Sequence, residues 1–145
     1  MVLNKWVSTE NNLPEVEKLC FFLLECNSAF SQSRKTTCRG CLAKDGRWYN
    51  QKSLSYVKAE NVHFWMAFPK PEEMIPCTAA LPKNHSSVIV RTEDGKTALA
   101  EFQLAYDEET QSYTKEFYWI YVNAFGEPIR LNVTHWTEIP SVHAA

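Results

Sequence analysis

The strongest constraint on the fold of this chain is that its sequence repeats itself. The segment Asn61–Pro69 reads NVHFWMAFP and Asn132–Pro140 reads NVTHWTEIP, each with Asn-Val at its start, a central Trp and a closing Pro. A second matched pair lies upstream, LPEVEKLCFFLL from Leu13 and LPKNHSSVIVRT from Leu81. Because both pairs occur in the same order, the chain is predicted to contain tandem copies of one small module.

The repeat also predicts the domain boundaries. We expect a first module over residues 1–72 and a second over 73–145, with a linker at about 70–80 that holds two prolines and a Glu pair. A module of this size buries a small share of its surface and is marginal alone. The two copies are therefore expected to pack with internal pseudo-symmetry, and a chain that carries both copies is expected to be a monomer.

Alternating apolar residues and turn residues predict an all-β, mainly antiparallel fold with about four strands in each module. In the second module, Thr97–Tyr106 has apolar side chains at every second position, and Tyr113–Val122 is a long aromatic strand. In the first, Leu19–Glu25 is apolar on both faces, which is typical of a central strand covered on both sides. The polar segment Cys26–Lys35 is expected to be a loop, and Gln51–Glu60 to hold a short helix.

Charge and composition exclude some functions. The net charge is −2, and no segment forms the basic stripe that neutralises phosphates, so binding to nucleic acid is disfavoured. The longest apolar run, Leu19–Leu24, is far too short to span a membrane. The opening sequence has no apolar segment of the signal-peptide kind, and five cysteines do not form closed disulfide pairs. Reduced thiols in a cytoplasm are therefore expected.

The cysteines allow two interpretations. Cys38 and Cys41 have the spacing of a zinc knuckle, and further ligands for a zinc ion would come from two of Cys20, Cys26 and His63. Alignment of the Lys-Thr pairs of the two copies places Cys38 and Cys41 opposite Leu99 and Phe102, which are ordinary strand residues. We therefore expect packed thiols and no cofactor, with a zinc-stabilised module as the alternative.

The matched tryptophans Trp65 and Trp136 are the clearest residues shared by the copies. Strict alternation places each on a mostly polar strand face, where the ring either caps the module or anchors a partner. With Tyr118 and Trp119 they form the set of candidate partner-binding residues. The histidines of the two copies do not occupy equivalent positions, and no catalytic motif is present in the sequence, so no catalytic residue is assigned and an enzyme is not expected.

The opening Trp6-Val-Ser-Thr with Leu13-Pro14, and the close Val133-Thr134-His135-Trp136 followed by Pro140, resemble the domain-of-unknown-function family numbered 551 of phages and prophages. The opening signature is best kept in the first module and the closing one in the second. The resemblance implies a phage or prophage accessory protein with a small β-rich fold. It implies no activity.

These observations favour a small accessory protein that acts by protein–protein binding in the cytoplasm of a bacterial host. Its partner would be a host or phage protein, and inhibition of a host defence or regulatory protein is one form of this. One alternative is the zinc-stabilised binding module. Another is a small-molecule enzyme or binder with its site in the cleft between the modules, a common place for pockets.

Overall fold

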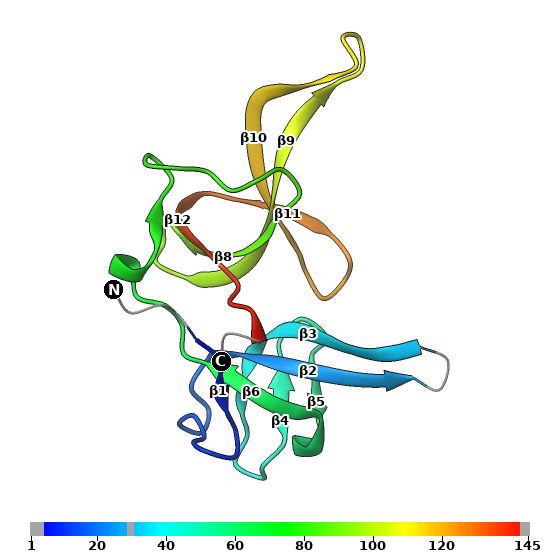
Figure 1. Cartoon of the computed structure of the whole chain (residues 1–145), viewed down its shortest axis with the longest axis vertical. Helices are drawn as coiled ribbons and strands as arrows, with labels where there is room; N and C mark the ends of the chain where they lie inside the picture. The colour runs from blue at the N-terminus through cyan, green and yellow to red at the C-terminus, as the bar shows by residue number, and fades with distance from the viewer. Residues whose placement is uncertain (1–4, 29–30, 143–145) are drawn as a thin grey trace. The chain divides into compact units, whose positions relative to one another are not determined.

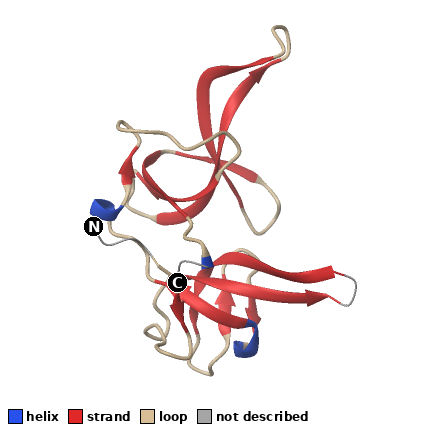
Figure 2. Ribbon diagram, viewed as in Figure 1, coloured by secondary structure: helices blue, strands red, loops and turns tan. Residues whose placement is uncertain are grey.

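The regular secondary structure of the chain is almost entirely β-strand, as the computed structural model shows for residues 5–28 and 31–142 (Figure 1, Figure 2). Side chains are described outside 26–34. Its contacts divide it into a first unit, Met1–Pro69 with Pro140–Ala145, and a second unit, Lys70–Ile139. Each unit contains one six-stranded sheet in which every described pairing is antiparallel. The predicted fold class is confirmed, and the strands beyond four in each sheet are short edge strands.

The first sheet has the order β1-β6-β2-β3-β4-β5. Its elements are β1 (Val7–Ser8), β2 (Cys20–Ser28), β3 (Ser31–Leu42), β4 (Trp48–Asn50), β5 (Ser55–Val57), the 3-10 helix η1 (Ala59–Asn61) and β6 (Val62–Met66). The loop predicted over 26–35 is wrong, because β2 and β3 extend through this segment and pair Cys26 with Arg34. A two-stranded ribbon accommodates polar residues because both of its faces can meet water. The segment 51–60 holds β5 and the start of η1.

The second sheet has the order β7-β12-β8-β9-β10-β11. Its unit comprises the 3-10 helix η2 (Pro71–Glu73), β7 (Ile75–Pro76), β8 (Ser87–Thr92), β9 (Thr97–Asp107), β10 (Ser112–Val122), β11 (Pro128–Leu131) and β12 (Val133–Glu138). Tight turns join the strands at Gly95 and Gly126, whose φ angles of +84° and +78° favour glycine. Within the described part of the chain, no helix combines the length and apolar character needed to cross a membrane.

The two sheets have the same topology, strand for strand. The order of β1-β6-β2-β3-β4-β5 matches β7-β12-β8-β9-β10-β11, so the repeat extends from the sequence to the pairing pattern. Backbone hydrogen bonds repeat as well: Glu17 N–H donates to Leu42 O at 2.8 Å, and His85 N–H donates to Phe102 O at 2.8 Å. Glu17 and His85 also share a left-handed backbone, with φ of 67° and 66°. The loops that precede β2 and β8 are therefore the same structure built twice.

Strand register corrects the residue alignment on which the cysteine interpretation depended. Cys38 lies opposite Phe22 and Ala98 lies opposite Val90, and Phe22 and Val90 in turn pair with the matched tryptophans. The structural counterpart of Cys38 is thus Ala98 and not Leu99. The error arose because the hairpins that join β2 to β3 and β8 to β9 differ in length, so the Lys-Thr pairs do not correspond.

A β-bulge lies at the same place in both return strands. In β6, Val62 pairs with Leu24 and Phe64 with Leu23, which leaves His63 as an extra residue. Thr134 is the extra residue in β12, between the pairs Val133–Thr92 and His135–Arg91. One extra residue reverses the alternation of side chains along a strand.

The bulges explain which residues reach the cores. Val62 and Trp65 both pack in the first core, and Val133 and Trp136 both pack in the second, although each pair would point to opposite faces of a regular strand. The predicted polar environment of the two tryptophans is therefore wrong. Phe21 and Phe22 are consecutive and both 0% exposed, which confirms that Leu19–Glu25 includes a strand covered on both faces.

Candidate functional site

The matched tryptophans fix the loops that precede β2 and β8. The indole N–H of Trp65 donates to Asn12 O at 2.9 Å, and that of Trp136 donates to Ala80 O at 2.9 Å. Trp136 is buried at 6% exposure, whereas Trp65 is half-buried. In both units the tryptophan therefore joins its return strand to a loop, which is the structural cap considered from the sequence.

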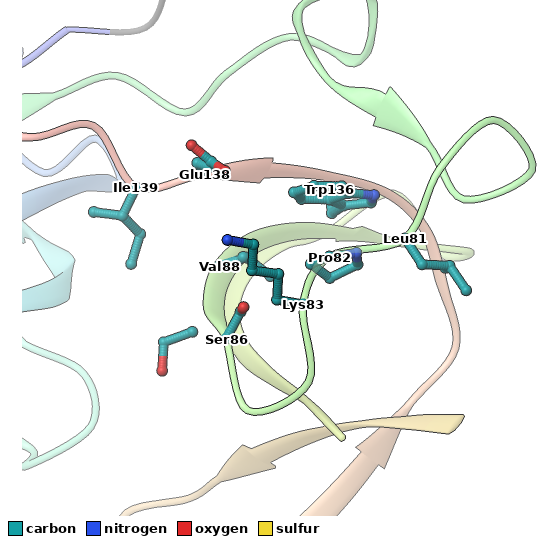
Figure 3. Close-up of a pocket in the computed structure, with 9 residues that line it drawn as sticks. Leu81, Pro82, Lys83, Ser86, Val88, Trp136, Glu138 and Ile139 are labelled. Carbon is teal, nitrogen blue, oxygen red and sulfur yellow. The ribbon is translucent and has the colours of Figure 1, made fainter. Parts of the chain in front are cut away.

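An open groove of about 550 Å³ lies beside Trp136 in the second unit (Figure 3). Its walls come from the loop before β8, the first residues of β8, and the end of β12. The lining residues are Leu81, Pro82, Lys83, Ser86, Ser87, Val88, Trp136, Glu138 and Ile139. This volume lies within the range of about 300–1,000 Å³ that is usual for ligand pockets.

The loop that forms one wall is held in place by backbone bonds. Its left-handed turn at His85 directs that residue's N–H to Phe102 O, and Phe102 N–H donates to Ser86 O at 2.9 Å. The side-chain oxygen of Asn84 accepts a hydrogen bond from Leu104 N–H at 2.9 Å. The wall is therefore attached to β9 at several points and is preorganised before any ligand arrives.

The groove combines an apolar base with charges of both signs. Leu81, Pro82 and Ile139 supply its accessible apolar surface, because Trp136 and Val88 are only 6% and 2% exposed. Lys83 and Glu138 are exposed and oppositely charged. The repeat places Glu15 and Ala67 at the corresponding positions of the first unit. The charge pattern is thus a property of the second unit and is not shared by its copy.

The other candidate partner-binding residues lie elsewhere. Trp119 is 4% exposed and packs in the second core, with its ring centroid 4.9 Å from that of Phe102. Tyr118, the residue before Trp119, is half-buried on the opposite face of β10. The guanidinium carbon of Arg130 lies 4.7 Å from the centre of its ring. Of Trp65, Trp136, Tyr118 and Trp119, the structure places only Trp136 against the groove.

The cysteine pair of the zinc alternative is divided between the two faces of β3. Cys38 and Cys41 are three positions apart in a regularly paired stretch, so their side chains point to opposite faces. Cys38 and Cys20 belong to the first core, and His63 lies 3.3 Å from the carboxylate of Glu25. Among the side chains that the structure describes, no three His, Cys, Asp or Glu residues gather as a metal site would require. The side chain of Cys26 lies outside the described residues.

Burial also governs the chemistry of these thiols. It raises the pKa of the Cys20 thiol to about 12, and the nearby Cys41 adds to the shift. The pKa of Cys41 is raised first by burial and then by the carboxylate of Glu17, and that of Cys77 by burial alone. The thiolate is the reactive form, so burial slows the reaction of these thiols at neutral pH, most strongly for the buried Cys20.

Comparison of the chain with models of protein families, with curated proteins and with solved structures gives no match. The resemblance to family 551 stays a prediction. Sequence reasoning also missed the groove around Lys83 and Glu138. The matched Leu-Pro pair at Leu81 did mark the loop, but the groove becomes visible only once the bulge has placed Trp136 on the correct face.

Proposed function

We propose that this protein acts by binding another protein, and that the groove beside Trp136 receives an extended segment of that partner. The observation that carries the proposal is a preformed groove with an apolar base and one exposed charge of each sign. The accessible apolar surface comes from Leu81, which is 40% exposed, and from the partly exposed Pro82 and Ile139, because Trp136 is itself buried.

The charges suggest how the segment would be oriented. Lys83 favours an acidic group at the loop side of the groove, and Glu138 favours a basic group at the β12 side. Two charges of opposite sign select one direction of a chain with the complementary order and disfavour the reverse. Exposed charges of this kind affect specificity and association rate more than total affinity.

The resemblance to a phage and prophage family supports placing this interaction in the cytoplasm of a bacterial host. The partner we propose is a host or phage protein, and the protein would act by occupying its surface. Inhibition of a host defence or regulatory protein is the form of this function that fits a small accessory protein.

The test is affinity capture from a bacterial lysate with the tagged protein, read by mass spectrometry. We expect one protein to be recovered near stoichiometrically with the wild type and to be lost with Lys83→Glu and with Glu138→Lys. Both side chains are exposed, so the fold should be retained, which circular dichroism would verify. Glu15→Lys changes the equivalent position of the first unit and is the matched control. Equal recovery by the groove variants, or no recovery above background by the wild type, would contradict the proposal.

The second candidate function is binding of a small molecule in the same groove, which its volume of about 550 Å³ would accommodate. A fragment screen by NMR would identify it through shifts at Trp136 and Val88. Loss of those shifts in the Lys83→Glu variant, in the absence of a captured protein, would favour this candidate over the first.

A further inference from the structure

The β9–β10 hairpin continues well beyond the sheet to which it belongs. Strand β8 pairs with β9 from Thr97 to Glu101, and β11 pairs with β10 from Trp119 to Val122. Past these pairings the two strands run on as a ribbon, which ends in the yellow turn of Figure 1. The first unit has no such extension, because its β4 covers only Trp48–Asn50.

One face of this ribbon carries an aromatic shelf, defined as Tyr106, Tyr113 and Phe117. These side chains are 53%, 52% and 44% exposed. The rings of Tyr106 and Tyr113 lie 5.1 Å apart, and the ring of Phe117 lies 5.4 Å from that of the core residue Phe102. The shelf therefore continues the apolar face of the second sheet into solvent.

The two edges of the ribbon differ. The edge of β9 is partly occupied, because Phe102 exchanges backbone hydrogen bonds with the loop before β8 and Leu104 N–H donates to the side chain of Asn84. Along β10, no strand within residues 5–28 or 31–142 pairs with the side of Ser112–Tyr118 that faces away from β9. The shelf thus lies beside an accessible strand edge.

The hairpin is strongly acidic. Between Thr97 and Val122 it holds five carboxylates and one lysine, at Glu101, Asp107, Glu108, Glu109, Glu116 and Lys115. A second copy of the chain would bring the same excess of negative charge to this surface, so like-charge repulsion disfavours self-association. A positively charged partner is favoured for the same reason.

We propose that the aromatic shelf binds a basic, extended segment of a partner protein that lies along β10 with its apolar side chains on Tyr106, Tyr113 and Phe117. Addition of an extended segment at an open strand edge is a recurring mode of recognition, in which alternate side chains supply specificity. The register shift between Tyr113 and Phe117 divides this edge, so the segment would pair with β10 on either side of the shift. The inference rests on the proposed protein-binding function but uses a surface distinct from the groove.

The test is an NMR titration of the purified full chain with two synthetic peptides, acetylated and amidated (Lys-Val)4 and (Glu-Val)4. We expect the basic peptide to give saturable chemical-shift changes at the shelf. Its affinity should fall in about 0.5 M salt, because salt screens attraction between exposed charges. Tyr113→Ser should weaken binding at least tenfold, on the scale expected for a principal contact. The matched control is Tyr56→Ser, which replaces a tyrosine of similar exposure, 53%, in the first unit and should leave binding unchanged.

Equal binding of the acidic peptide would overturn the inference, as would the absence of saturable shifts at the shelf at millimolar peptide. Tyr113 is half-exposed at an edge, so its replacement should leave the fold intact; Phe117→Ser is the second variant, checked by its NMR dispersion. Shelf binding that persists in Lys83→Glu, together with failure of affinity capture, would support the shelf and reject the groove. Capture of a partner without peptide binding at the shelf would support the groove and reject the shelf.

Discussion

Replacement of Trp136 tests whether this side chain is the structural centre of the second unit. The ring is 6% exposed, packs with Phe102 and Trp119 in one core, and donates its N–H to Ala80 O. Trp136→Phe keeps an aromatic ring but removes the donor, whereas Trp136→Ala removes both. Because Phe is also smaller than Trp, Trp136→Phe removes the hydrogen bond and part of the packing, and Trp136→Ala removes the hydrogen bond and most of the packing.

The magnitudes follow from these contacts. Loss of one hydrogen bond to a carbonyl that lies near water costs about 0.5–1.5 kcal/mol. Loss of a buried Trp ring costs about 3–5 kcal/mol, because the cavity that remains is added to the lost burial. For a unit of this size, each 1 kcal/mol lowers Tm by about 4–8 °C. Loss of the hydrogen bond alone should make Trp136→Phe lower Tm of the second unit by about 2–12 °C, and Trp136→Ala should lower it by about 12 °C or more.

The assay is urea and thermal unfolding followed by far-ultraviolet circular dichroism, with Trp65→Phe and Trp65→Ala as matched variants of the first unit. Trp65 makes the same indole bond to Asn12 O but is only half-buried, so both of its variants should cost less than the matching variants of Trp136. A Trp136→Ala protein whose free energy of unfolding lies within about 1 kcal/mol of the wild-type value would refute the reasoning, because removal of a buried Trp side chain costs more than that. A folded Trp136→Phe protein that no longer captures its partner would add a binding role to the structural one.

Three further results are expected. Gly40→Ala should destabilise the first unit by about 3 kcal/mol or more in urea unfolding, because its Cβ would overlap the backbone oxygen of Tyr49. Burial raises the pKa of Cys20 to about 12 from an ordinary 9.0, so stability should be complete below pH 9 and fall by up to about 4 kcal/mol as pH rises toward 12. Cys20→Val should flatten that pH profile in denaturant titrations. A thiol reagent should modify the half-buried Cys41 and Cys77 well before Cys20, as peptide mass mapping would show.

Local signals predicted the strands of the second unit well. The turns at Gly95 and Gly126 and the alternation in Thr97–Tyr106 are encoded within a few residues, and β9 and β10 begin and end close to the predicted positions. The loop predicted over 26–35 failed for a different reason. Polar composition describes exposure to water, and a two-stranded ribbon is exposed on both faces without being a loop.

The face occupied by the tryptophans could not be predicted because a bulge is a property of two strands. The residues Val133–Trp136 give no local signal that Thr134 lacks a cross-strand partner in β8, because this follows only from how β12 pairs with β8. The groove was missed as a consequence, because its base is Trp136 and its wall is a loop whose position depends on hydrogen bonds to β9. The repeat itself contained the hint, because two residues separate Val from Trp in both copies.

The positions at which the two copies differ in length show where such a module tolerates insertions. The first copy has the longer strands where β2 meets β3, and the second has the longer strands where β9 meets β10. The spacing from Val62 to Trp65 is unchanged from Val133 to Trp136, because one residue more or fewer there would turn the tryptophan away from its core. An epitope tag placed in the β9–β10 turn should therefore be accepted, and the same tag within β12 should not. Hairpin ends are therefore the parts of this module that can gain residues, whereas the return strand must keep its length to hold the tryptophan in the core.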